Sequence, residues 1–227
     1  MAGKVGAVIV AAGSSSRMGG VDKTFAPILG LPLVLHTLDR FEQSPLVHQI
    51  VLVLAKDSLD LGKQMVQQRA YTKVTNVCAG GRRRQDSVRF GLEQLTACEW
   101  VMVHDGARPC LDDAILGRGL EAAAEFGSAV AGVPVKDTIK VVSADQTVQE
   151  TPDRSLLWAA QTPQVFRYRT LLDSHYACTQ DFTDDAAMVE SMGHKVKMFL
   201  GAYENIKVTT ADDLIIAETF LRASSST

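Results

Sequence analysis

The sequence predicts an α/β fold with a mostly parallel sheet, in a single domain that spans residues 1–227. Short apolar runs rich in β-branched residues recur along the chain, and segments with helical spacing of apolar residues separate them. The runs are almost continuously apolar, as expected for strands that crossover helices cover on both faces of a sheet. A chain of 227 residues can bury one core without splitting into several domains.

Strands and helices alternate through the first part of the chain. The expected strands are Val5–Val10, Gln49–Leu54, Lys73–Cys78, Trp100–His104 and Ala129–Val133. The segments with helical spacing include Pro32–Gln43, Asp86–Leu95 and Asp112–Phe126. Ligands of such sheets bind at the carboxyl ends of the strands, so the loops that follow the strands are the places to search for a site.

Polar and apolar residues alternate after Val135, which predicts a β-hairpin arm over residues 135–158 within the domain. Exposed apolar side chains on such an arm favour aggregation unless they are covered, and the same arm of a second subunit is an economical cover. We therefore expect a homodimer that forms through the arm.

The last third of the chain returns to helical patterns after Gln161-Thr162-Pro163-Gln164. The expected elements are the helices Arg169–Ala177 and Asp184–Met192, the strand Lys195–Leu200, an extended piece Asn205–Thr209 and a closing helix Thr210–Leu221. Thr183 is expected to cap the second of these helices, and residues 224–227 to form a flexible tail.

The composition is that of an ordinary globular protein, with 46% hydrophobic residues, 22% charged residues and a formal net charge of −3. No apolar segment is long enough to span a bilayer, and no basic-then-apolar leader opens the chain. A slightly acidic protein repels nucleic acid, so small phosphorylated ligands at a local cationic site fit better. The widely spaced Cys78, Cys98, Cys110 and Cys178 are typical of reduced thiols, and we expect a cytoplasmic protein.

The loop after the first strand has the strongest chemical signal. It reads Ala11-Ala12-Gly13-Ser14-Ser15-Ser16-Arg17-Met18-Gly19, and Lys23 follows. Small residues let backbone N–H groups approach an anion, while Arg17 and Lys23 add the charge that a polyphosphate requires. An ordinary strand-to-helix turn with solvated cations explains the same residues. Neither the Walker loop nor the NAD fingerprint fits, since Ser15 stands where the latter needs its second glycine.

Two further loops at the same expected edge carry charged residues. Residues 79–87 run from Ala79-Gly80-Gly81 through three arginines to Ser87, and residues 104–109 read His-Asp-Gly-Ala-Arg-Pro. Taken singly, the arginine run is typical of a solvated helix start, and Asp105 with Arg108 of a local ion pair that shapes a turn. Their common position at one edge of the sheet favours a binding site. Lys207, a cation in an apolar setting, is expected near that edge as well.

Taken in order, these motifs resemble the 2-C-methyl-D-erythritol 4-phosphate cytidylyltransferases of the non-mevalonate isoprenoid pathway, nearly from end to end. The remaining motifs that carry the resemblance are Arg84-Gln85-x-Ser87-Val88, Lys136-Asp137-Thr138, Gln161-Thr162-Pro163-Gln164, Thr183-Asp184-Asp185 and Asn205-Ile206-Lys207-Val208-Thr209. The resemblance implies a Rossmann-like nucleotidyltransferase domain. It also implies transfer of CMP from CTP to 2-C-methyl-D-erythritol 4-phosphate, with pyrophosphate as the second product and Mg²⁺ bound mainly through the CTP phosphates.

The resemblance also implies roles for individual residues. The catalytic residues would be Arg17, Lys23, Arg154 and Lys207. The nucleotide-binding residues would be Ala11, Ala12, Gly13, Ser14, Gly80, Gly81, Ser87, Asp105 and Gly106. The acceptor-binding residues would be Asp105, Arg108, Thr138, Arg154, Thr162 and Lys207, of which Thr138 and Arg154 would come from the partner's arm. Arg82 departs from the acid found in relatives, and no residue is expected to ligate a metal directly.

Two other functions remain open at this point. A ribitol-5-phosphate cytidylyltransferase would share the nucleotide half of the site and differ only in the acceptor pocket. A non-catalytic nucleotide-sensing module would keep the fold without the chemistry. Such a module needs only the nucleotide contacts, whereas this chain also has Arg154 and Lys207.

Overall fold

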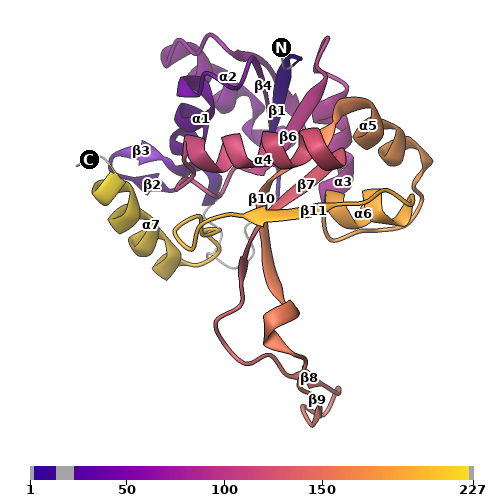
Figure 1. Cartoon of the computed structure of the whole chain (residues 1–227). Helices are drawn as coiled ribbons and strands as arrows, with labels where there is room; N and C mark the ends of the chain where they lie inside the picture. Colours follow the sequence, from indigo (N-terminus) through magenta and orange to yellow (C-terminus); the bar gives the residue numbers. More distant parts are fainter. Residues whose placement is uncertain (1–2, 14–22, 225–227) are drawn as a thin grey trace.

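A seven-stranded sheet forms the centre of the protein (Figure 1). The computed structural model describes residues 3–13 and 23–224, without the side chain of Lys23. The strand order is β11-β7-β10-β6-β1-β4-β5. The strands are β1 (Val5–Ala11), β4 (Gln49–Leu54), β5 (Val74–Ala79), β6 (Trp100–Asp105), β7 (Ser128–Pro134), β10 (Trp158–Arg167) and β11 (Lys197–Leu200). All neighbours pair in parallel except β10, which is antiparallel to both β6 and β7, so the predicted mostly parallel α/β fold is confirmed.

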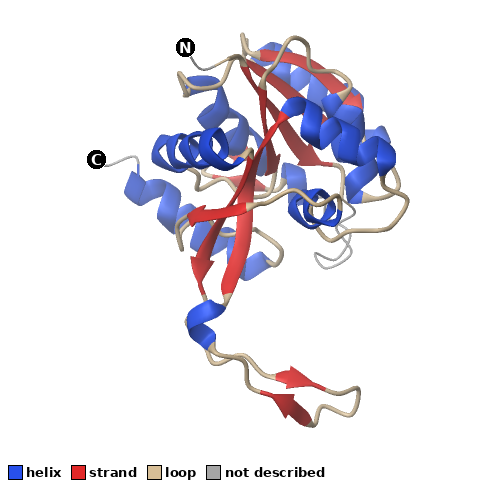
Figure 2. Ribbon diagram, turned by 45° about the vertical axis from the view of Figure 1, so that its right-hand side comes forward, coloured by secondary structure: helices blue, strands red, loops and turns tan. Residues whose placement is uncertain are grey.

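Helices cover both faces of this sheet (Figure 2). They are α1 (Leu33–Gln43), α2 (Leu59–Gln68), α3 (Arg84–Leu92), α4 (Asp113–Phe126), α5 (Tyr168–Ala177), α6 (Asp185–Ser191) and α7 (Ala211–Ser224). Successive side chains of a strand point to opposite faces. In β1, Ala7 and Ile9 accordingly pack in the core that includes α1 and α4, while Val8 packs in the core that includes α3 and α5.

Smaller elements complete the body. Short 3₁₀ turns lie at η2 (Lys23–Phe25), η3 (Lys56–Ser58) and η4 (Arg154–Leu156), and β2 (Pro27–Ile28) pairs with β3 (Leu31–Pro32). Helix α7 packs through Ala217 and Leu221 in a third apolar cluster. That cluster also contains Val208, so it anchors the segment that carries Lys207.

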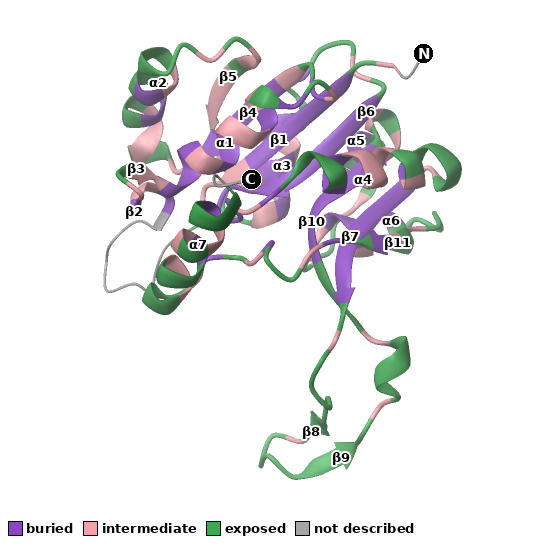
Figure 3. Ribbon diagram, turned by 60° about the vertical axis from the view of Figure 1, so that its left-hand side comes forward, coloured by how far each residue is buried: buried purple, intermediate pink, exposed green. Residues whose placement is uncertain are grey.

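An arm leaves the body between β7 and β10 (Figure 3). Its tip is a short antiparallel pair of β8 (Val141–Val142) and β9 (Val148–Glu150), at the position where the alternating pattern predicts a hairpin. Its side chains are mostly exposed, and Leu156 is 79% exposed although it is apolar.

The sequence-based prediction misses β10, because it ends the arm at Trp158 and places a helical region after Gln164. Residues Gln161, Thr162 and Gln164 are polar, and Pro163 is typical of a turn, yet the three polar side chains are buried in the sheet. A register shift between Ala160 and Gln164 accommodates this stretch. Helix α2 is not among the segments named from the sequence, and only Gly62 and Met65 of its residues are buried.

Several boundaries also differ from the prediction. The cap of α6 is Asp184 and not Thr183, because the Asp184 carboxylate accepts a hydrogen bond from the backbone N–H of Ala187 at 2.9 Å. The piece expected to be extended over 205–209 pairs with no described strand. Ser224 is the last residue of α7, and residues 225–227 of the expected tail lie outside the described part of the chain.

Candidate functional site

Two adjoining cavities lie at the carboxyl edge of the sheet. Cavity A has a volume of about 350 Å³ and is lined by the loops that follow β1, β5 and β6. Cavity B has a volume of about 170 Å³ and is lined by the end of β6, by β10 and by the start of α6. Arg84, Asp105 and Lys207 line both cavities, so these three residues mark the junction between them.

The first loop lines one wall of cavity A. Ala11, Ala12 and Gly13 line it, as does Thr24 of η2, whose hydroxyl donates to the carbonyl oxygen of Ala11 at 3.3 Å. Ser14, Arg17 and the side chain of Lys23 lie outside the described part of the chain.

The second loop closes the opposite wall of cavity A. The Ser87 hydroxyl accepts from the backbone N–H of Gly81 at 3.0 Å and donates to the carbonyl of Arg83 at 3.1 Å. A Cβ at Gly80 would lie 2.3 Å from Cβ of Ala12, so the close approach of the two loops requires glycine there. Gly81, Ser87 and Arg82 line the cavity. Gly80 is not among the lining residues and lies against Ala12 instead.

Asp105 ends β6 and carries the negative charge of the junction. Its Oδ2 is 2.9 Å from Nζ of Lys207 and 3.3 Å from Nε of Arg108. Burial by itself would raise the pKa of this carboxyl. The positive charges of Lys207, Arg84 and Arg108 lower the pKa by a larger amount, so the net pKa lies well below the ordinary value. Asp105 is therefore ionised at neutral pH.

Gly106, the residue after Asp105, lies where the third loop meets the first. The backbone N–H of Gly106 donates to the carbonyl of Val10, which fastens the third loop to the first. A Cβ at Gly106 would lie 2.8 Å from Cβ of Ala11. The first and third loops therefore pack closely against each other at this edge of the sheet, and Gly106 leaves room for Ala11.

A buried hydrogen-bond network supports the junction from behind. The Thr162 hydroxyl accepts from the backbone N–H of Asp105 at 3.0 Å and bonds Nδ1 of His104 at 3.0 Å, while Nε2 of His104 bonds the carbonyl of Arg108 at 3.1 Å. Because that carbonyl can only accept, His104 carries its proton on Nε2. Burial lowers the pKa of His104 to about 4, so the ring is neutral. Sequence reasoning did not select His104 as a site residue, although it belongs to the motif of residues 104–109.

Asn205 extends this network to the Lys207 segment. Its side-chain amide donates to the carbonyl of Thr162 at 2.8 Å, and its own backbone carbonyl accepts from Nη1 of Arg108 at 2.8 Å. Arg108, Thr162 and Lys207 thereby meet at cavity B, although they are far apart in the sequence.

Arg84 is the junction residue that sequence reasoning did not select as a site residue. Its Nη1 lies 2.6 Å from Oδ2 of Asp185, and Nε lies 3.8 Å from Oδ1 of Asp105. Both Arg84 and Asp185 belong to motifs that the sequence displays, but helix capping explained the acidic motif adequately. Only the tertiary structure brings the start of α3 and the start of α6 close enough to pair them.

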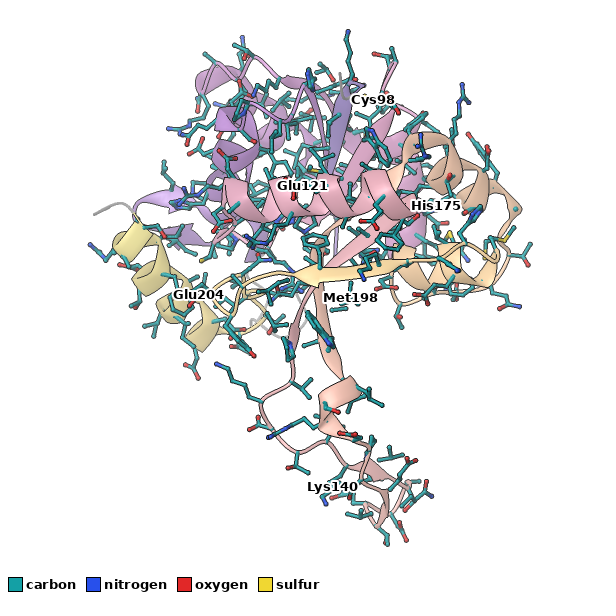
Figure 4. All side chains as sticks on the ribbon, viewed as in Figure 1. Cys98, Glu121, Lys140, His175, Met198 and Glu204 are labelled. Carbon is teal, nitrogen blue, oxygen red and sulfur yellow. The ribbon has the colours of Figure 1, made fainter. Side chains whose placement is uncertain are left out.

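Two of the expected site residues lie on the arm. Neither Thr138 nor Arg154 lines cavity A or B of this single chain. Nη1 of Arg154 donates instead to the carbonyl of Lys136 at 2.6 Å. Figure 4 shows how far the arm, marked by Lys140, extends from the body of the molecule.

The described residues contain no group of three or more His, Cys, Asp or Glu side chains placed to hold a metal ion. Asp105 is the carboxylate at the junction, and its oxygens already face three cations. Within the same residues, no helix has both the length and the apolar character needed to cross a bilayer.

Known proteins resemble nearly the whole chain. The sequence pattern of the 2-C-methyl-D-erythritol 4-phosphate cytidylyltransferase family matches residues 5–223. The enzyme of that name from Dehalococcoides mccartyi is 49% identical over 219 residues, which cover 96% of each chain. The one from Alkaliphilus metalliredigens is 45% identical, with 97% of this chain and 94% of the relative covered. The crystal structure of 4-diphosphocytidyl-2C-methyl-D-erythritol synthase from Anaerococcus prevotii superposes with a TM-score of 0.84 at 28% identity, over 96% of each chain.

Proposed function

The chain belongs to the 2-C-methyl-D-erythritol 4-phosphate cytidylyltransferase family, and on that premise we propose how its residues divide the work of the reaction. It is a nucleotidyltransferase that transfers CMP from CTP to 2-C-methyl-D-erythritol 4-phosphate in isoprenoid precursor biosynthesis. The products are 4-diphosphocytidyl-2-C-methyl-D-erythritol and pyrophosphate.

The reaction joins two anions. A phosphate oxygen of the acceptor forms a bond to the α-phosphorus of CTP, and the bond from that phosphorus to the bridging oxygen of the β-phosphate breaks. Pyrophosphate leaves with the electron pair. The protein has to align and neutralise the reactants, which calls for cations and backbone N–H groups and for no nucleophilic side chain. The observation that carries the proposal is the junction of the two cavities, where bound donor and acceptor would meet.

Cavity A is the proposed CTP site. Backbone groups of Ala11, Ala12 and Gly13, together with Ser14 and Gly106, would surround the phosphates and ribose, and Asp105 borders the same space. Gly80, Gly81 and Ser87 would read the cytosine edge in a space too small for a purine. Arg17 and Lys23 would stabilise the charge that builds on the triphosphate, and Lys23→Ala should then lower kcat by more than about tenfold.

Cavity B is the proposed acceptor site. Lys207 would contact the acceptor phosphate. Its Nζ lies 2.9 Å from Oδ2 of Asp105, and this ion pair holds the ammonium group at the junction. Arg108 and Thr162 would bind the same substrate, because both line this cavity and the buried network fixes both.

A second subunit would complete the acceptor site through Thr138 and Arg154. The exposed apolar side chains of the arm, such as Val142, Val148 and Leu156, support a homodimer that buries them. Since neither Thr138 nor Arg154 lines a cavity of its own chain, the proposal places them in the partner's site.

Mg²⁺ would accompany CTP and reduce the repulsion between the phosphate groups. The described residues fit a metal that arrives on the nucleotide better than one held by protein ligands, because Asp105 is paired with cations. Cys78, Cys98, Cys110 and Cys178 are free thiols, which supports a reducing compartment such as the cytoplasm.

Pyrophosphate release with Mg²⁺ and CTP tests the function directly. Methylerythritol phosphate and ribitol 5-phosphate would be compared, and each component omitted in turn. We expect release only with methylerythritol phosphate. A preference for ribitol 5-phosphate would overturn the acceptor, and release with neither would favour a nucleotide sensor.

A further inference from the structure

Arg84 lies where cavity A meets cavity B, at the first residue of α3. Its Nη1 is occupied by Asp185, and its Nε is 3.8 Å from Asp105, beyond hydrogen-bond distance. Nη2 has no hydrogen-bond partner among residues 3–13 and 24–224. It is also not one of the fully buried side-chain atoms in that part of the chain that lack a partner. Part of the guanidinium group therefore remains free to bind a ligand at the junction.

Asp185 holds Arg84 from the interior. The Asp185 side chain is 1% exposed, and that of His175 behind it is 2% exposed. Nε2 of His175 donates to Oδ1 of Asp185 at 3.2 Å, while Arg84 binds the other carboxylate oxygen. A buried carboxylate needs such partners, because water cannot replace them. The chain of contacts runs from α5 through α6 to α3, and Figure 4 labels His175 at its start.

Arg84 and Lys207 face different oxygens of Asp105. Arg84 lies closer to Oδ1 and Lys207 to Oδ2, so the two cations flank one carboxylate at the boundary of the cavities. Negative charge moves across this boundary during the reaction, from the attacking phosphate oxygen to the departing pyrophosphate. A planar guanidinium with free N–H donors suits two phosphate groups at once.

We propose that Arg84 is a further catalytic residue, which contacts the acceptor phosphate and the α-phosphoryl group as the new bond forms, and that Asp185 and His175 are its positioning residues. This inference rests on the proposed function. The plainer role for the same contacts is an ion pair that only ties α3 to α6.

Steady-state rates of pyrophosphate release from Arg84→Lys, Asp185→Asn and the double variant distinguish these roles. Arg84→Lys keeps the charge beside Asp185 and removes the second donor group, so we expect kcat to fall by at least about tenfold. Asp185→Asn keeps the side-chain volume and loosens Arg84, so kcat should fall in the same direction. CTP affinity, measured by calorimetry, should change by less than about threefold in both, because the lost contact forms in the transition state.

The double variant tests whether Asp185 acts by positioning Arg84. If Asp185 acts through Arg84, adding Asp185→Asn to Arg84→Lys should lower kcat by less than about twofold more. A purely structural ion pair would leave kcat of folded Arg84→Lys within about twofold of wild type and would move only the melting temperature. If Asp185→Asn lowers kcat by the same factor in the wild-type protein and in Arg84→Lys, the positioning role is overturned.

Matched controls are available on the same helices. Arg89→Lys on α3 and Glu190→Gln on α6 change charged side chains outside both cavities and should leave kcat unchanged. If Arg84→Lys does not fold, Asp185→Asn alone decides the matter, since an unchanged kcat in that variant contradicts the proposal. Wild-type release with methylerythritol phosphate tests the proposed function separately, so the failure of one is not mistaken for that of the other.

Discussion

At the scale of single residues, the junction depends on groups that do not themselves line a cavity. His104 is fully buried and bonds both Thr162 and the carbonyl of Arg108. Nδ1 of the neutral ring accepts from the Thr162 hydroxyl, which in turn accepts from the backbone N–H of Asp105, while Nε2 donates to the carbonyl of Arg108. The position of the charged residues is thus coupled to the protonation state of a histidine that the substrates do not reach.

Acid should destabilise the protein through His104. The ordinary pKa of 6.5 falls to about 4 in the folded state through burial, so the unfolded chain binds the proton more readily. The contribution to stability is complete above pH 6.5, at about 3 kcal/mol, and is lost as the pH falls toward 4. Urea unfolding of His104→Gln between about pH 7 and pH 4.5 should show a shallower loss than wild type. Exposed His194→Gln is the control, and equal slopes for His104→Gln and wild type would refute the assignment.

Gly80→Ala should separate the first two loops. Its Cβ would overlap Cβ of Ala12 and approach the Ser87 hydroxyl to 2.7 Å, so we expect a loss of about 1–3 kcal/mol in stability and a raised KM for CTP. Gly117→Ala on α4 is the matched control, because its nearest atom is 4.0 Å away. That control should gain about 0.5–1 kcal/mol from helix propensity. Chemical denaturation and initial rates at varied CTP measure both effects.

At the scale of elements, β10 joins cavity B to helix α6. It inserts antiparallel between β6 and β7, and it carries Gln161, Thr162 and Gln164 into the edge where cavity B forms. Gln164 also donates to Asp184 at 2.8 Å and accepts from the backbone N–H of Ala186, which fixes the start of α6. The same strand therefore holds both the cavity B side of the junction and the helix that carries Asp185.

The N-cap of α4 offers a stability test that is remote from both cavities. The Asp112 carboxylate accepts from the backbone N–H of Ile115 at 2.8 Å. Asp112→Ala should cost about 1 kcal/mol of unfolding free energy, since it leaves a helix-end donor without its partner. Asp113→Ala in the first turn should cost less, and kcat should stay unchanged in both. A larger loss from Asp113→Ala would contradict the capping assignment.

At the scale of the whole molecule, the arm is the part that the body does not bury. Its two short strands pair only with each other among the described strands, and its apolar side chains face solvent in a single chain. An isolated two-stranded hairpin of this kind is marginally stable in water. Association with a second arm would cover the exposed apolar side chains and so stabilise the hairpin. It would also bring Arg154 to the site of the neighbouring subunit.

Mixed dimers test the sharing of sites. A heterodimer of an Arg154→Ala chain and a Lys23→Ala chain contains one site with both residues intact if Arg154 serves the partner. We expect it to recover about half of the wild-type activity, although each homodimer is inactive. A heterodimer of wild type with the Lys23→Ala, Arg154→Ala double variant should then be inactive. The opposite pattern would show that Arg154 acts within its own chain.

The sequence by itself determined the mostly parallel α/β class, the three loops at one edge and the family. Those features depend on local periodicity and on ordered motifs, which a single chain displays without reference to its neighbours. Only the tertiary structure decided the insertion of β10, the buried role of His104 and the pairing of Arg84 with Asp185. The Arg84–Asp185 contact joins residues 101 positions apart. Such contacts arise from how helices pack on the sheet, and a polar residue has the same local pattern whether packing buries it or leaves it in water.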